Sequence, residues 1–268
     1  YEDIMLASYA LEGGLHRHDL SYLAQHYFQQ QRLSFAEFAR KGGRACAFSE
    51  IDLPRAAPYA AESADLIFRL YHRLGEEFQS EEDLRKIYED IERPLLPILE
   101  AMERRGVLLD TDALTKQSQE LATALAELEA EVFALAGTTF NLNSPKQLQE
   151  VLYEKLGLDP VKKTPKGQPA TSEEALNALL EQHAIPALIL RYRHLGKLKS
   201  TYTDPLPKQV DAAQRVHCSY NQTVTATGRL SSSQPNLQNI PIRSPEGSRI
   251  RQAFIAKSGY SLLSADYS

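Results

Sequence analysis

Cysteine is scarce in this chain of 268 residues, since Cys46 and Cys218 are the only two. They fit no metal-ligand spacing and make a poor disulfide framework, so we expect two free thiols. Long apolar runs are also missing, because no stretch approaches the roughly 20 residues of a membrane span. The first residues, Tyr1-Glu2-Asp3, are unlike a signal sequence. The sequence therefore predicts a soluble, cytoplasmic protein with no membrane partner.

An overall excess of positive charge is absent as well. The net charge is -5, which argues against a uniformly basic nucleic-acid-binding protein. The charges are unevenly distributed, however: residues 191–268 contain 11 Lys/Arg and 4 Asp/Glu, whereas the first 190 residues contain 19 and 31. This asymmetry makes the C-terminal part the candidate anion-binding part, with a chance imbalance of surface charge as the alternative.

Helical patterns dominate the first two thirds of the chain. Apolar spacing and capping residues predict helices over 18–28, 34–41, 59–74, 110–137, 143–157, 171–183 and 186–202. Asp110 or Thr111 is suited to begin the longest of them and Gly137 to end it, while Ser144 and Gly157 are suited to begin and end the next. Thr171 fits the cap of a capping box.

The last third has the patterns of strands. Residues 215–227 alternate and are rich in Val, Thr and Tyr, and residues 250–256 and 261–266 flank a predicted hairpin turn at 257–260. Two prolines between Glu89 and Pro97 predict a break and a domain boundary there. The expected fold class is α+β, mainly helical and then antiparallel strands.

Asp266 follows the small and apolar stretch "YSLLSA" at the end of the last predicted strand. A carboxylate delivered by a buried strand is a typical ligand of Mg²⁺, which completes its coordination with substrate phosphates and water. A strand-terminal aspartate that only forms a turn is the alternative.

A second candidate is the amide-rich segment "TVTATGRLSSSQPNLQNIP", residues 223–241, which has one cationic and no anionic side chain. Arg229 can donate to the minor-groove acceptors that every base pair presents, and Asn236, Gln238 and Asn239 can reach bases or sugars. Such a set would bind a duplex without regard to sequence. The alternative is a polar loop whose amides bond to its own backbone.

Two basic groups are candidates for phosphate contacts. Arg193 and Lys197 are four residues apart on one face of a predicted helix, and Lys162, Lys163 and Lys166 lie in one polar loop. A solvated, charged surface is the alternative for both groups.

These residues belong to motifs that identify a family. The stretches "TATGRLSSSQPNLQNIPIR", "RIRQAFIA" and "SADYS", with "ATSEEAL" and "LGKLKSTYTD", resemble the family A DNA polymerases over essentially the full length of the chain. The resemblance implies three parts: residues 1–90 as the C-terminal part of a 3'-5' exonuclease-like domain, 91–205 as the thumb, and 206–268 as the start of the palm.

The resemblance also implies roles for the candidate residues. Asp266 would bind both catalytic Mg²⁺ ions, with the Tyr267 carbonyl as a further ligand, while the ions activate the primer 3'-hydroxyl and stabilise the phosphoryl transfer. Arg229 would hold the primer terminus in the minor groove, and Arg193 and Lys197 would contact the primer backbone. The implied partners are primer–template duplex DNA and deoxynucleoside triphosphates, and the implied location is the bacterial cytoplasm, at the nucleoid.

The exonuclease part departs from the family pattern. "YAAESAD" resembles a motif in which a metal-binding Asp follows a Tyr by four positions, but here Tyr59 is followed by Ser63. A neutral hydroxyl is a poor ligand for a hard dication. Glu62 and Asp65 would point roughly 100° and 200° away from Ser63 on a helix. We therefore expect a degenerate proofreading site, kept as scaffold.

The sequence ends inside the first palm motif, so the 268 residues tested alone are expected not to extend a primer. The leading interpretation is part of a DNA-directed DNA polymerase, a monomer if the chain continues. The alternative is a non-catalytic duplex-binding half of a split or truncated polymerase, which would need a partner chain. A nuclease is the weaker third interpretation, because Ser63 argues against it.

Overall fold

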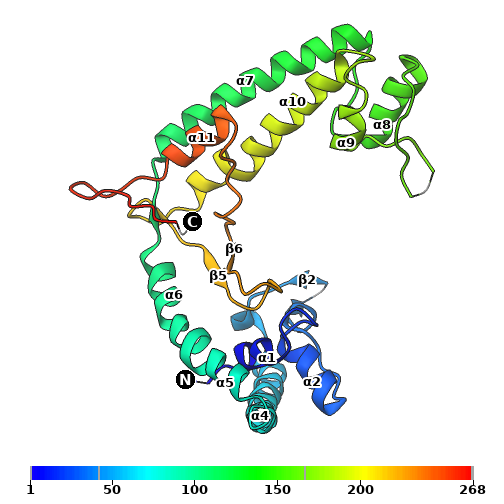
Figure 1. Cartoon of the computed structure of the whole chain (residues 1–268). Coiled ribbons are helices and arrows are strands. Elements are labelled where there is room, and N and C mark those ends of the chain that lie inside the picture. The colour runs from blue at the N-terminus through cyan, green and yellow to red at the C-terminus, as the bar shows by residue number, and fades with distance from the viewer. Residues whose placement is uncertain (1, 42, 166, 267–268) are drawn as a thin grey trace. The chain divides into compact units, whose positions relative to one another are not determined.

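The computed structural model describes residues 2–41, 43–165 and 167–266. The chain divides into two compact units. The first contains Tyr1–Gly106 and Cys218–Gln238, and the second contains Val107–His217 and Asn239–Ser268. Both units are mainly helical, with short antiparallel strand pairs, as Figure 1 shows. The prediction of a mainly helical chain with antiparallel strands in its last third is confirmed.

The first unit is a set of helices to which a late strand pair is added. Its elements are α1 (Ile4–Glu12), α2 (Leu20–Phe28), α3 (Phe35–Phe38), β1 (Arg40–Lys41), β2 (Arg44–Ala45), a 3₁₀ turn (Phe48–Glu50), α4 (Leu53–Glu77), α5 (Glu82–Ile87), a π-helical turn (Tyr88–Glu92), α6 (Arg93–Arg105), β5 (Ser219–Asn221) and β6 (Ser231–Ser233). Helices α1 and α4 and the start of the π-helical turn share a core of Leu6, Ala7, Leu74, Phe78 and Tyr88, against which Leu84 of α5 packs.

The second unit is built on two long helices that run side by side, α7 and α10 (Figure 1). Its elements are β3 (Val107–Leu108), α7 (Thr111–Ala136), α8 (Pro145–Gln149), a π-helical turn (Glu150–Lys155), α9 (Glu173–Asn177), α10 (Ile185–Leu198), a second π-helical turn (Lys199–Thr203), a 3₁₀ turn (Leu206–Lys208), β4 (Arg215–Val216) and α11 (Pro245–Gln252). Fully buried aliphatic side chains, among them Val132, Leu148, Leu176 and Ile189, pack α7 to α10 together.

Local capping explains where several of these helices begin. The Asp110 carboxylate accepts from the Ala113 N–H, and the Ser144 hydroxyl accepts from the Gln147 N–H, as the sequence predicts. The cap of α9 is a correction, because Ser172 accepts from the Ala175 N–H and the predicted Thr171 is buried instead.

Two further expectations are wrong. The hairpin over 250–266 does not form as a strand pair: a turn is present, with Tyr260 N–H donating to Lys257 O, but Ile250–Gln252 belong to α11 and residues 261–266 are not in a strand. The reason is the Ser244 cap followed by Pro245, which starts a helix. No interruption of the helix occurs between Glu89 and Pro97 either, because the chain stays helical from the π-helical turn into α6, with Pro94 in the first turn of α6 and Pro97 inside it. The domain boundary predicted there stays a prediction.

Within the described residues, no helix combines the length and the apolar content needed to cross a bilayer.

Candidate nucleic-acid interface and metal ligand

The strand pair β5–β6 positions the amide-rich segment. The two strands are antiparallel, with Ser219 opposite Ser233 and Asn221 opposite Ser231, so the connection between them begins and ends at a fixed register. Arg229 lies in this connection, two residues before β6. Asn236 and Gln238 follow β6 on its other side. Three of the predicted residues are therefore carried by one short hairpin.

The connection is fixed to α1 and the loop after it. Tyr9 donates its hydroxyl to the Thr225 carbonyl over 2.7 Å, and the Thr225 hydroxyl donates to the Arg229 carbonyl over 2.6 Å. Gly14 lies so close that a Cβ there would be 2.6 Å from the Cβ of Ala226, and its φ of +80° favours glycine too. The backbone of Arg229 is thus held by Thr225, which is itself held by Tyr9, a residue 216 positions away from Thr225 in sequence.

The Arg229 side chain itself extends from this fixed backbone into solvent. It is exposed, and among the described residues its guanidinium has no hydrogen-bond or ion-pair partner. An arginine keeps its charge at any physiological pH, and its planar donor set suits base-edge and phosphate acceptors. The hairpin therefore presents an unpaired cation on an ordered loop.

The neighbouring amides are used in part by the loop itself. The Asn236 Oδ1 accepts from the Gln238 N–H over 3.0 Å, and the Gln238 Nε2 donates to the Leu230 carbonyl over 3.0 Å. These bonds match the alternative of a polar loop that satisfies its own backbone. Both side chains remain exposed, so each keeps bonding capacity for a ligand. Asn239 belongs to the second unit, where its carbonyl accepts from the Tyr202 hydroxyl and its side chain is exposed.

The two basic residues of α10 have different surroundings. Arg193 is half-buried, donates to the Thr171 carbonyl, and so joins α10 to the segment that begins α9. Burial lowers the pKa of this guanidinium from its ordinary value. Lys197, one turn later, is exposed. The Lys197 side chain is therefore accessible to a phosphate, whereas the Arg193 guanidinium already donates a hydrogen bond within the fold.

The basic loop is a small hairpin-like turn. Thr164 N–H donates to the Gln168 carbonyl, and Ala170 N–H donates to the Lys162 carbonyl, which brings the two ends of the loop together. Lys162 forms an ion pair with Glu174, while Lys163 is exposed. Lys166 lies outside the described residues.

Asp266 is exposed at the end of an irregular segment, not at the end of a strand. The part of the chain that the structure describes places Asp266 in no group of three or more potential metal ligands. Tyr267, its predicted companion, lies outside the described residues. A single exposed carboxylate has the donor chemistry for a hard dication, but it supplies one ligand only.

Tyr59 and Ser63 lie on α4, and both are contacted by Arg32, a residue of the segment after α2 that the sequence analysis did not identify. The Arg32 Nη2 donates to the Ser63 hydroxyl over 2.8 Å, and its guanidinium lies 4.6 Å above the Tyr59 ring. Arg32 Nε also lies 3.6 Å from Glu62 Oε2, and the arginine side chain is only 2% exposed. A buried cation thus stands beside the position where the family motif has a metal-binding carboxylate. The sequence has no signal for this contact, because 31 residues separate Arg32 from Ser63.

A sequence model of "DNA polymerase family A" matches residues 111–268. The chain belongs to this family. A "3'-5' exonuclease" model matches residues 1–79 of this family A chain, in the first unit. The resemblance expected from the motifs is confirmed.

Relatives and a solved structure agree with the family. The DNA polymerase I of Pseudomonas aeruginosa is 49% identical over 268 residues, which are 99% of this chain and 29% of that protein. The thermostable DNA polymerase I of Thermus aquaticus is 53% identical over 211 residues, 78% of this chain and 25% of that protein. A solved polymerase domain from M. smegmatis, in complex with DNA primer-template and dNTP, has a TM-score of 0.78 at 32% identity, over 97% of this chain and 42% of that one. The chain thus spans less than a third of the curated relatives' length.

Proposed function

We propose that this chain is the duplex-holding part of a DNA-directed DNA polymerase. The observation that carries the proposal is Arg229, an exposed and unpaired guanidinium on a loop whose backbone is fixed by β5–β6 and Tyr9. The minor groove presents acceptors at every base pair, so one ordered arginine contacts any sequence. The family of the chain supports a primer–template duplex as the ligand.

In this proposal the chain has three functional parts. Residues 1–90 are the late exonuclease-like part, residues 91–205 the thumb, and residues 206–268 the start of the palm. The exonuclease match over residues 1–79 supports the first of them. The exposed Lys163 and Lys197, with Arg193, Lys162 and Lys166, contact backbone phosphates, while Asn236, Gln238 and Asn239 add contacts to sugars and bases. Such phosphate contacts are individually modest and weaken with salt.

The catalytic metal in the proposal is Mg²⁺, with Asp266 and the Tyr267 carbonyl among its ligands. Two such ions supply Lewis-acid activation of the primer hydroxyl and stabilisation of the phosphoryl group of the incoming deoxynucleotide. Asp266 provides one hard oxygen donor, so the rest of a two-ion site must come from other residues. For that reason the 268 residues alone are expected to bind duplex without extending a primer.

Proofreading is proposed to be lost. Arg32 supports this, because its buried positive charge lies 2.8 Å from the hydroxyl at position 63 and repels a dication there. The parent protein is expected to leave the 3' end of single-stranded DNA intact in the presence of Mg²⁺ or Mn²⁺. Rapid removal of nucleotides from that end would contradict the proposal.

The proposal is tested with Arg229→Ala and the matched control Arg104→Ala. Arg104 is an exposed arginine of the same unit, already paired with Glu100. We expect Arg229→Ala to weaken primer–template affinity about 10-fold, or about 1.4 kcal/mol, whatever the sequence of the duplex. Fluorescence anisotropy of a labelled duplex measures the dissociation constant. Equal affinity of the two variants would contradict the assignment of Arg229.

A duplex-binding half of a split polymerase is the second candidate. This candidate predicts the same binding of duplex DNA but requires a partner chain. Primer extension would then appear only when a separate chain that carries the remaining site residues is added. If the polypeptide continues, the protein works as a monomer. In either case we propose the bacterial cytoplasm, at the nucleoid, as the location.

A further inference from the structure

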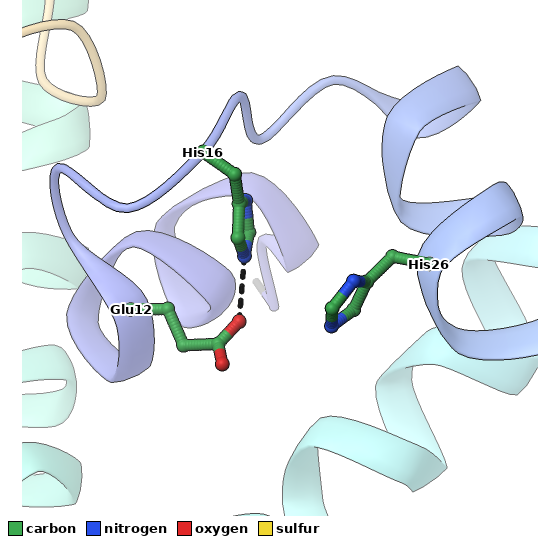
Figure 2. Close-up of side chains that lie close together, drawn as sticks. All are labelled: Glu12, His16 and His26. Carbon is green, nitrogen blue, oxygen red and sulfur yellow. Dashed lines mark hydrogen bonds and ion pairs between the residues drawn. The ribbon is translucent and has the colours of Figure 1, made fainter.

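A histidine-rich cluster lies in the first unit, away from the residues considered so far. Glu12 is the last residue of α1, His16 lies in the loop that follows, and His26 lies in the last turn of α2. One carboxylate oxygen and one ring nitrogen from each histidine lie within 4.8 Å of one another. Figure 2 shows the imidazole of His26 directed toward the Glu12 carboxylate and the His16 ring.

Hydrogen bonds orient His16 for a ligand. Its Nδ1 lies 2.8 Å from the carbonyl oxygen of Arg17, which can only accept, so Nδ1 carries a proton. Its Nε2 is thereby directed at the Glu12 Oε2, 2.6 Å away. An imidazole that donates one N–H to a backbone carbonyl and presents its other nitrogen is the usual arrangement of a metal-bound histidine.

Aromatic contacts fix the two rings relative to each other. Tyr22 stacks on His16 with ring centres 4.6 Å apart, and on His26 with ring centres 5.8 Å apart. His18, whose ring is 4.8 Å from that of His16, has its Nδ1 bonded to the Ser8 hydroxyl and is buried. The ligand set is therefore Glu12, His16 and His26.

We infer that Glu12, His16 and His26 bind a transition-metal dication of the Zn²⁺ class, which fastens the end of α1 to α2. Two imidazoles and one carboxylate are the donor set of such ions, whereas Mg²⁺ prefers oxygen ligands alone. In a tetrahedral site with bonds of roughly 2.0 Å, ligand atoms lie about 3.3 Å apart. The side chains reach that spacing with shifts on the order of 1 Å, given bonds of that length.

A simple Glu12–His16 ion pair explains two of the three residues. It does not explain why His26, an exposed side chain from another helix, approaches the same point. A dication between the three groups accounts for all of them and leaves its fourth position to water. This inference is independent of the polymerase assignment, because it uses none of the residues proposed to bind DNA.

The test is a Co²⁺ and Zn²⁺ titration of the full-length protein in excess Mg²⁺, which occupies sites made of oxygen ligands. His26→Asn is the main variant because His26 is exposed and its loss leaves the core intact. His16→Asn is the second variant. The control is His72→Asn, because His72 is an exposed histidine on α4 whose ring lies against the rings of Phe68 and Tyr71.

We expect one equivalent of Co²⁺ with the visible absorption of a four-coordinate ion in the wild type and in His72→Asn. His26→Asn and His16→Asn should each bind Co²⁺ at least about 10-fold more weakly, because even the loss of a residue that only hydrogen-bonds to a metal ligand lowers metal affinity by about that factor. A wild type that binds no such equivalent would overturn the inference. An unchanged Co²⁺ affinity in the His26→Asn variant would also overturn the inference. Circular dichroism verifies that this variant is folded.

Discussion

At the scale of single residues, the molecule contains two arginines with opposite surroundings. Arg229 is exposed and unpaired among the described residues, whereas the Arg32 side chain is buried against Glu62, Tyr59 and Ser63. The first arrangement leaves a cation available for an external anion. The second uses the cation to hold α4 to the segment after α2. The same residue type thus has a structural role at Arg32 and a proposed role in DNA binding at Arg229.

The Arg32 contact predicts a stability effect. Arg32→Ala should lower the free energy of unfolding by about 2 kcal/mol, because it removes the cation that pairs with the partly buried Glu62 and leaves that carboxylate with the hydrogen bond from Gln30. The value lies below that of a fully buried pair, since the Glu62 side chain is 34% exposed. Urea denaturation measures it, with the exposed Arg104→Ala as a control that should change little. Equal effects of both variants would show that the Arg32 cluster adds no stability.

At the scale of elements, α7 is joined to the π-helical turn after α10 by one polar cluster. Lys199 donates to the Asp204 carboxylate over 2.8 Å, and the Ser118 hydroxyl of α7 donates to the same group. Burial raises the pKa of Asp204, but the bonds from Lys199 and Ser118 outweigh it, so the pKa lies below the ordinary 3.8. The charged carboxylate is therefore favoured by the folded state.

This shift predicts a dependence of stability on pH. Below pH 3.8 the unfolded chain takes up a proton at Asp204 before the folded chain does, so acidification favours unfolding. The contribution of the cluster is complete above that pH and is lost as the pH falls through the folded pKa. Urea titrations of the wild type and Asp204→Asn should differ at pH 6, and the difference in the free energy of unfolding should shrink as the pH falls below 3.8. A difference that is constant with pH would contradict the assignment.

The elements also show what sequence can and cannot predict. The starts of α7 and α8 were predicted because a cap is a contact between residues three apart, as at Asp110 and Ser144. The strand pair β3–β4 was not predicted, since its partners are more than 100 residues apart. The prediction of a C-terminal hairpin was wrong because Ser244 caps the start of α11, as Ser144 caps α8, and residues with strand-like alternation became part of that helix.

At the scale of the whole molecule, the family was predicted from motifs and the arrangement of the site was not. Arg229, Asn236 and Gln238 are close in sequence, so one hairpin presents them together. The anchor of that hairpin, Tyr9, and the cluster of Glu12, His16 and His26 depend on tertiary contacts that no local pattern encodes. The predicted roles of Asp266 and of the three functional parts stay predictions.

The central claim is that this chain holds DNA for a polymerase whose metal ligand is Asp266. Its most direct test is primer extension by the full-length protein with Asp266→Asn, and with Asp65→Asn, an exposed aspartate of α4, as the control. We expect Asp266→Asn to slow extension at least about 100-fold, since a metal contributes several kcal/mol to the transition state. Primer–template affinity should stay within about 2-fold of the wild type, roughly 0.4 kcal/mol. Extension at the wild-type rate by Asp266→Asn would contradict the account.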